Sequence, residues 1–251
     1  MDHGRPPEPG GPGAAMAAGD RYWEAMDPER TAARSVARAE LALALLARAG
    51  IRGGTLLDVG CGPGFALERI ARAGFTARGA EASPAAAARA RARGLRVEVL
   101  DIESAPLPAG FDLVTAFEVL EHLRDPLRVL RSMAGALAPG GKLVVSLPNE
   151  FHLLRRLSIL AGLPGAAGHR QFGGHDDPHL HLFDPRQSER LFAAAGLRVL
   201  ASAWDGLAPP RLRAARPLSS ALAALRPSLF ALAGVHLLDP APVPPVRSDA
   251  P

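Results

Sequence analysis

Residues 56–64 read LLDVGCGPG, an apolar run that ends in an acid and passes into three spaced glycines. The apolar run predicts a buried strand over Thr55–Val59, and the residues after it predict a helix over Pro63–Ala73 with proline near its first turn. Glycines in such a turn adopt backbone angles that other residues avoid, and they let a ligand approach the main chain closely. The stretch therefore predicts a nucleotide-binding turn between a strand and a helix.

The spacing of these glycines separates two classes of cofactor. A dinucleotide fingerprint reads G-x-G-x-x-G, whereas here Gly64 comes one position early and Phe65 stands where that fingerprint has Gly or Ala. This spacing disfavours an NAD(P) oxidoreductase and favours a cofactor without phosphates.

Acids also end the next two predicted strands. Glu81 closes the strand Phe75–Glu81, where a carboxylate can accept both hydroxyls of a ribose. Asp101 closes the strand Leu95–Asp101, where it can accept from the exocyclic amine of an adenine while Ile102 packs on the ring. Together with the glycine turn, these residues predict a nucleoside site along the carboxyl ends of successive strands.

The remaining sequence continues the alternation of apolar strands and amphipathic helices. We predict helices at Pro28–Ala49, Ser83–Arg93, Val119–Leu123, Pro126–Leu137, Phe151–Leu163 and Pro185–Ala195, and strands at Phe111–Ala116, Lys142–Leu147, Gly196–Ala203 and Leu229–Leu238. The last strand is expected to pair antiparallel with residues 197–203. Such an alternation predicts an α/β fold with parallel strands, right-handed crossovers and helices on both faces.

Length and composition limit the alternatives. The 251 residues suit one α/β domain, and they contain no apolar run long enough for an integral membrane segment and no secretory leader. The single cysteine fits a reducing cytoplasm. The net charge of +4 comes from arginines spread along the chain, which favours a compositional bias over a nucleic-acid surface. We expect a cytoplasmic protein that does not bind nucleic acid; its oligomeric state stays open.

Several stretches resemble the class I S-adenosylmethionine (SAM)-dependent methyltransferases of the methyltransferase-domain family, including the quinone-biosynthesis O-methyltransferase type. They are LLDVGCGPG (56–64), GAEASP (79–84), LDIESAPLP (100–108), FDLVTAFEVLEHLRDP (111–126), LAPGGKLVVSLPN (137–149) and HLHLFDPRQSERLFAAAGLRV (179–199). The resemblance implies a Rossmann-like, doubly wound seven-stranded sheet in the order 3-2-1-4-5-7-6, with the last strand antiparallel. We expect a methyltransferase domain at 21–239 with a core at 53–203 and a lid-like insert at 150–180, between disordered segments at 1–20 and 240–251.

The resemblance also implies where SAM binds. Carried over position by position, the cofactor-binding residues are expected to be Asp58, Gly60, Cys61, Gly62, Gly64, Glu81, Ala82, Asp101, Ile102 and Phe117. Asp58 and the glycines would hold the methionine end, and the backbone of Phe117 would meet the methionine amino group. The chain departs from the family at Glu81-Ala82, where an aspartate and a larger apolar residue are common, but a glutamate still reaches a ribose.

Methyl transfer is an in-line displacement that needs a positioned acceptor and in some cases a base. The catalytic candidates are His122, as a general base, with Glu118 and Glu121. The spacing i, i+3 and i+4 places all three on one helical face, and the distal His179 is expected to join them. Two carboxylates and two imidazoles suit a divalent metal ion, and two metal-dependent branches of the superfamily use a similar set. The metal is the less favoured alternative, because relatives without a metal share the same pattern.

We therefore expect transfer of the SAM methyl group to an oxygen, less favourably a nitrogen or carbon, of a small-molecule acceptor. The alternatives are a SAM-binding domain that is non-catalytic or regulatory and a metal-dependent RNA 2′-O-methyltransferase. The apolar helix Phe151–Leu163 and the His-rich loop Gly165–Asp177 are expected to form a lid, with contact to a membrane surface as a minor alternative.

Overall fold

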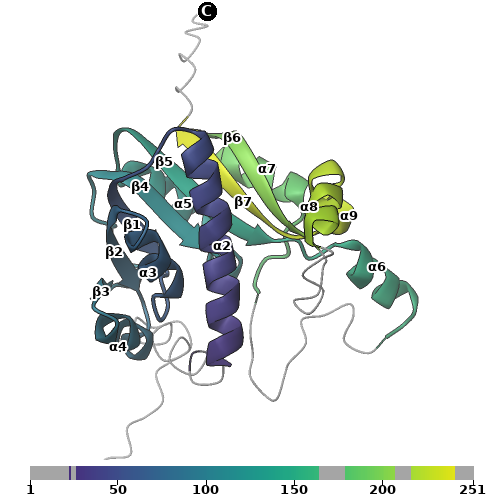
Figure 1. Ribbon diagram of the computed structural model, residues 1–251, viewed down its shortest axis with the longest axis horizontal. Coiled ribbons are helices and arrows are strands. Elements are labelled where there is room, and N and C mark those ends of the chain that lie inside the picture. The colour runs from purple at the N-terminus through teal and green to yellow at the C-terminus, as the bar shows by residue number, and fades with distance from the viewer. Residues whose placement is uncertain (1–22, 24–26, 164–178, 207–215, 241–251) are drawn as a thin grey trace, which may run out of the picture.

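The computed structural model describes residues 23, 27–163, 179–206 and 216–240 (Figure 1). The segment 1–20, the loop Gly165–Asp177 and residues 241–251, for which disorder or a lid was predicted, lie outside the described residues. None of the helices within the described ranges is both long enough and apolar enough to cross a membrane.

Seven strands form one sheet in the order β3-β2-β1-β4-β5-β7-β6. Their bounds are β1 Gly54–Val59, β2 Phe75–Glu81, β3 Arg96–Val99, β4 Phe111–Phe117, β5 Leu137–Pro148, β6 Leu197–Gly206 and β7 Ala231–Pro240. Strands β1 to β5 run parallel to one another, and β7 lies between β5 and β6, antiparallel to both. The predicted fold class, strand order and antiparallel last strand are confirmed.

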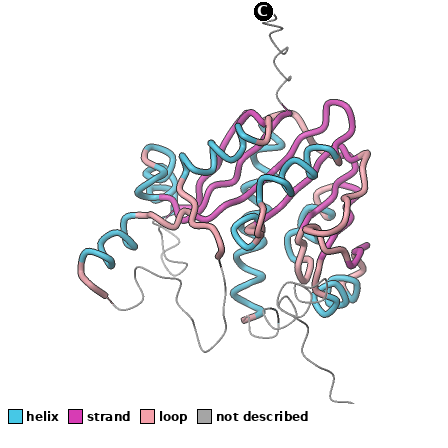
Figure 2. The backbone as a smooth tube through the Cα atoms, turned by 180° about the vertical axis from the view of Figure 1, so that it is seen from behind, coloured by secondary structure: helices cyan, strands magenta, loops and turns pink. Residues whose placement is uncertain are grey.

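Helices cover both faces of this sheet, as the opposite views of Figures 1 and 2 show. Their bounds are α2 Pro28–Arg48, α3 Phe65–Ala71, α4 Pro84–Ala92, the 3-10 turn η1 Leu120–His122, α5 Pro126–Gly135, α6 Leu153–Leu160, α7 Pro185–Ala194, α8 Arg216–Leu225 and α9 Pro227–Phe230. Apolar residues of α2, α3 and α4 form one buried cluster against the sheet. Residues of η1, α5 and α7 form the second cluster on the other face.

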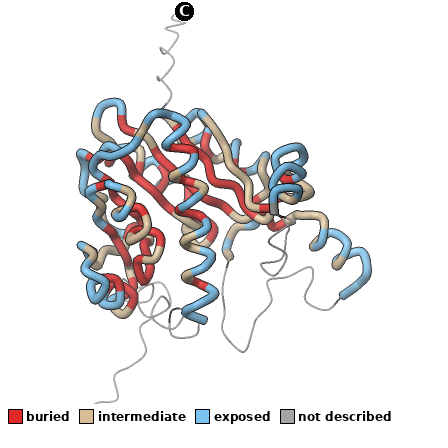
Figure 3. Tube along the Cα trace, in the orientation of Figure 1, coloured by how far each residue is buried: buried red, intermediate tan, exposed pale blue. Residues whose placement is uncertain are grey.

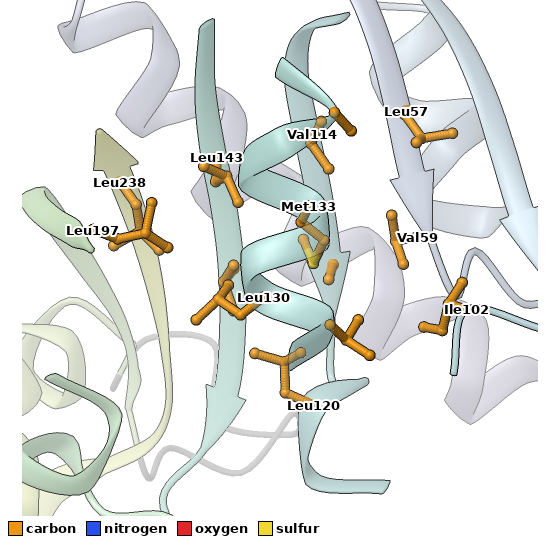
Figure 4. Close-up of a cluster of buried hydrophobic side chains, with 14 of the residues drawn as sticks. Leu57, Val59, Ile102, Val114, Leu120, Leu130, Met133, Leu143, Leu197 and Leu238 are labelled. Atoms are coloured by element: carbon orange, nitrogen blue, oxygen red, sulfur yellow. The ribbon is translucent and has the colours of Figure 1, made fainter. Parts of the chain in front are cut away.

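Each layer follows from local sequence signals. Four helices begin with a capping side chain followed by proline: Asp27, Ser83, Asp125 and Asp184 each accept from a backbone N–H of the first turn. The helices then present an apolar face at helical spacing; on α5 this face is Val129, Leu130 and Met133, all fully buried (Figure 4). The strands of the sheet are mostly buried between the two layers of helices (Figure 3).

The structure differs from the sequence predictions at several elements. Instead of a helix over Val119–Leu123 there is only the three-residue turn η1, because Glu118 before it has a positive φ of 55° and Leu123 after it is extended, with a ψ of 148°. Strand β5 begins at Leu137 rather than Lys142, with a register shift between Phe111 and Leu113 of its neighbour. β3 ends at Val99, two residues before Asp101.

The C-terminal part also differs. The predicted strand over residues 229–238 begins only at Ala231, because Pro227 opens the short helix α9. The helix α8, which packs on β6, was not predicted. The predicted helix over residues 151–163 shortens to α6, which has no buried residue and projects beside the sheet in Figure 1. The lid-like role of residues 150–180 stays a prediction.

Candidate functional site

The three glycines of the turn after β1 all have positive φ: 68° at Gly60, 54° at Gly62 and 83° at Gly64. They also leave no room for a side chain. A Cβ on Gly60 would lie 2.7 Å from Val119 Cγ2, and one on Gly62 would lie 2.6 Å from the indole of Trp23. The turn therefore requires glycine for both its conformation and its close neighbours.

Glu81, at the end of β2, supports this turn directly. One carboxylate oxygen accepts from Gly62 N at 2.8 Å, and the other accepts from Ser83 N at 2.8 Å. The residue is nearly fully buried. These bonds join the turn at residues 60–64, which we call the cofactor loop, to the end of the neighbouring strand, next to Ala82 and the start of α4. The Glu81 carboxylate is thus buried and fixed in orientation by two backbone N–H groups.

Asp58 lies beneath the loop and is 1% exposed. Its Oδ1 accepts from Thr115 Oγ1 at 2.6 Å. Burial raises the pKa of this carboxyl to about 7; the bond from Thr115 opposes the shift and the charge of Glu81 adds to it. Asp58 is thus an acid whose charge is costly in the protein without a bound cation.

Asp101 and Ile102, the two residues expected at the adenine, make different kinds of contact in the structure. Asp101 accepts from Glu103 N and from Ser104 Oγ, both at 2.9 Å, so that its carboxylate caps the turn after β3. Ile102 is almost fully buried in the apolar cluster, near Val59 (Figure 4).

Two further expected contacts of the cofactor also serve the packing of the domain. Cys61 is buried, and burial raises the pKa of its thiol. Its Sγ lies 2.5 Å from the place of a Cβ on Gly79. Phe117 ends β4 beside Ser146 and is partly buried against the cluster formed by α2, α3 and α4.

Contrary to the sequence prediction, Glu118 does not share a helical face with Glu121 and His122. Its Oε1 accepts from Ser146 Oγ at 2.8 Å and lies 3.4 Å from Nε of the buried Arg38, on α2. Arg38 also pairs with Asp205 Oδ2 at 2.6 Å. The prediction of one face for Glu118, Glu121 and His122 is wrong, because the positive φ at Glu118 turns this residue toward α2.

The other three candidates do come together. One ligand atom each of Glu121, His122 and His179 lies within 4.8 Å of the others. The rings of His122 and His179 meet edge to face with their centroids 4.7 Å apart. The backbone N–H groups of Leu180 and His181 donate to the Glu121 carbonyl at 2.8 and 3.1 Å, which ties the distal segment to η1. We call Glu121, His122 and His179 the Glu-His cluster.

The cofactor loop and the Glu-His cluster are neighbours, since Val119, which contacts Gly60, directly precedes η1. Sequence reasoning missed four residues that shape this region: Trp23 over Gly62, Arg38 at Glu118, Thr115 at Asp58, and Glu150. Each contacts its partner through space from another element, and a single sequence carries no signal for such pairs.

A Rossmann-like sheet with this strand order, a glycine turn after β1 and an acid at the end of β2 defines the class I SAM-dependent methyltransferase fold. The family model described as "Methyltransferase domain" matches residues 23–202. The chain therefore belongs to the methyltransferase-domain family.

Known proteins resemble the chain in sequence and in structure. A ubiquinone biosynthesis O-methyltransferase of Xanthomonas euvesicatoria pv. vesicatoria is 36% identical over 156 residues, which are 59% of this chain and 63% of that protein. One of Xanthomonas campestris pv. campestris is 34% identical over the same shares. The chain thus spans about 63% of the length of these relatives.

Two solved structures show the same fold. Magnesium protoporphyrin IX methyltransferase of Synechocystis PCC 6803, with bound S-adenosylhomocysteine (SAH), superposes with a TM-score of 0.60 at 15% identity, over 90% of this chain and 95% of that one. A SAM-dependent methyltransferase of Mesorhizobium loti gives a TM-score of 0.54 at 20% identity, over 78% and 97%.

Proposed function

We propose that the protein transfers the methyl group of SAM to an oxygen of a small-molecule acceptor. The observation that carries the proposal is the junction of Gly62 and Glu81 at the carboxyl end of the sheet, with the imidazole of His122 on the adjoining turn and that of the distal His179 edge to face with it. The names of the relatives, which are O-methyltransferases of ubiquinone biosynthesis, support oxygen as the acceptor atom. A cytoplasmic location remains a prediction.

The residues at this edge fit SAM. Glycines at positions 60, 62 and 64 give the turn its positive φ values, Glu81 is held by Gly62 N where it would accept the ribose hydroxyls, and the buried carboxyl of Asp58 would lie beneath the methionine end. When bound, SAM supplies an electrophilic methyl group on a sulfonium. The protein's share of the chemistry is to place the acceptor oxygen in line with that group and to remove its proton. We assign the removal of this proton to His122, which lies on η1 beside the glycine turn.

Two measurements test this proposal. SAH and NAD are titrated into the protein by calorimetry, and SAH release is then followed with SAM and a catechol, which offers two phenolic oxygens. Binding of SAH and release with the catechol are expected. Binding of NAD without SAH contradicts the cofactor assignment, and SAH binding without turnover over a wide acceptor screen favours the non-catalytic alternative.

A pair of variants locates the site. Glu81→Gln removes the charge that Gly62 N and Ser83 N share, and SAH affinity is expected to fall about tenfold or more, as for one charge-assisted hydrogen bond. Glu98→Gln makes the same change at an exposed position of β3 and should leave SAH affinity unchanged. Equal affinities of both variants would remove Glu81 from the cofactor site.

A second candidate function is metal-assisted methyl transfer. The Glu-His cluster offers one carboxylate and two imidazoles within 4.8 Å, a donor set that fits an ion of intermediate hardness such as Zn²⁺ or Mn²⁺. Glu118, the fourth expected ligand, pairs with Arg38 instead. A bound ion would lower the pKa of an acceptor hydroxyl.

Dialysis against a chelator decides this point. Loss of SAH release and its return with Mn²⁺, Mg²⁺ or Zn²⁺ is expected if the ion takes part; full activity in chelator excludes it. If the acceptor is RNA, binding should also weaken steeply with salt.

A further inference from the structure

Glu150 follows β5 and is nearly buried, although it belongs to a polar turn. Its backbone N–H donates to the Phe183 carbonyl at 2.9 Å, so its main chain is fixed. Its Oε1 lies 2.8 Å from Nδ1 of His179, and its carboxylate also forms an ion pair with Arg155 of α6. The side chains of these three residues are between 10% and 17% exposed, so the network is largely shielded from water.

Because Glu150 pairs with the guanidinium of Arg155, its carboxylate oxygens serve as hydrogen-bond acceptors. The hydrogen in the bond of 2.8 Å must therefore come from the ring, and Nδ1 of His179 carries it. In an imidazole, the nitrogen committed to such a bond decides which nitrogen serves other partners. For His179 the remaining nitrogen is Nε2.

We propose that Glu150 is a positioning residue for His179: it holds the ring through Nδ1–H and makes Nε2 the nitrogen that His179 presents to Glu121 and His122. The inference rests on the proposed function, because the orientation matters only if the Glu-His cluster handles a proton or a cation. Glu150 has no role in binding the cofactor, and its effect reaches the reaction through His179.

Arg155 completes the arrangement. Its guanidinium holds the Glu150 carboxylate in place, and it comes from α6, at the start of the insert. The insert thus contributes to the site a side chain that orients the cluster, in addition to any cover that it provides. A purely structural ion pair between Glu150 and Arg155 would not need His179 at hydrogen-bond distance.

The test is a proton–nitrogen NMR spectrum of protein labelled with ¹⁵N-histidine and bound to SAH. The wild-type protein is expected to show a protected ring N–H of His179 on Nδ1; the resonance is assigned by its absence in His179→Gln. It should disappear in Glu150→Ala and persist in Glu103→Ala, a matched change at a carboxylate that accepts from Arg124 N. With an acceptor, Glu150→Ala should lower kcat about 10- to 100-fold and leave the KM for SAM unchanged.

The outcomes separate the two proposals. A protected N–H on Nε2 in the wild-type protein, or one on Nδ1 that survives in Glu150→Ala, overturns the positioning role. The wild-type spectrum needs only His179→Gln for its assignment, so the nitrogen that carries the proton is read out even if Glu150→Ala fails to fold. If the Nδ1 resonance behaves as expected but no acceptor is methylated, the positioning role stands and the proposed function fails.

Discussion

Replacing Asp58 by asparagine changes the electrostatics beneath the cofactor loop without changing the shape of the side chain. Asparagine keeps an oxygen for the hydrogen bond from Thr115, which is 2.6 Å long in the structure. It removes a charge that the protein holds in a fully buried position. Because the charged form is the one that burial penalises, we expect the variant to be more stable than the wild-type protein at neutral and alkaline pH.

The size and pH range of this effect follow from the pKa of Asp58, which rises from 3.8 to about 7 on folding. With a raised pKa, the stabilising contribution is fully present below 3.8 and is lost as pH rises through 7. Each pKa unit corresponds to about 1.4 kcal/mol. The free energy of unfolding of Asp58→Asn relative to wild type should therefore grow by about 2 kcal/mol between pH 5 and pH 7 and level off near pH 8.

Urea unfolding followed by circular dichroism at pH 5, 6, 7 and 8 measures this difference. Asp112→Asn is the matched control, because bonds from Thr55 lower the pKa of that exposed carboxyl and its difference from wild type should not grow over the range. Affinity should move the other way: under the proposed function Asp58 holds the methionine end of the cofactor, so calorimetry should show weaker SAH binding by Asp58→Asn. A stability difference that stays flat from pH 5 to 8 would refute the reasoning.

Three further predictions concern other parts of the fold. Burial lowers the pKa of His236 to about 4, so the ring should stay neutral in an NMR titration down to that pH. The free energy of unfolding should fall by about 3 kcal/mol as the pH drops from 6.5 to 4, because only the unfolded state takes up the proton. A ring that titrates near 6.5 contradicts this prediction. Gly62→Ala and Gly94→Ala both force alanine into positive φ, so each variant should lose about 1–2 kcal/mol of stability. Calorimetry should show weaker SAH binding only for Gly62→Ala, because only its Cβ clashes with the indole ring of Trp23. Arg38→Ala should lower the free energy of unfolding in urea by about 3 kcal/mol, because Glu118 and Asp205 lose a buried partner. Arg69→Ala breaks an exposed ion pair and should lower it by less than about 1 kcal/mol. Equal losses of stability in the two variants would contradict this prediction.

The elements that the sequence predicted well carry strong local signals. Ser83 before Pro84 and Asp184 before Pro185 each supply a cap and a fixed first φ, so these helices begin where expected. The turn after β1 is equally local, since its glycines follow one buried strand directly. Errors lie where tertiary contacts override the pattern. η1 replaces a predicted helix because Glu118 bonds to Ser146 and Arg38 from two other elements.

The candidate site divides in the same way. The sequence by itself determined the glycine turn, the acid Glu81 in register with it and the pair Glu121-His122, because each is a short pattern tied to one strand or turn. Only the tertiary structure decided which partners these residues meet. Glu150 reaches His179 across 29 residues and Arg38 reaches Glu118 across 80, and such contacts depend on how whole elements pack. Because of that packing, Glu118 pairs with Arg38 instead of joining the Glu-His cluster, and Glu150 contacts the cluster through His179. A charged side chain that becomes buried on folding needs a partner at close range.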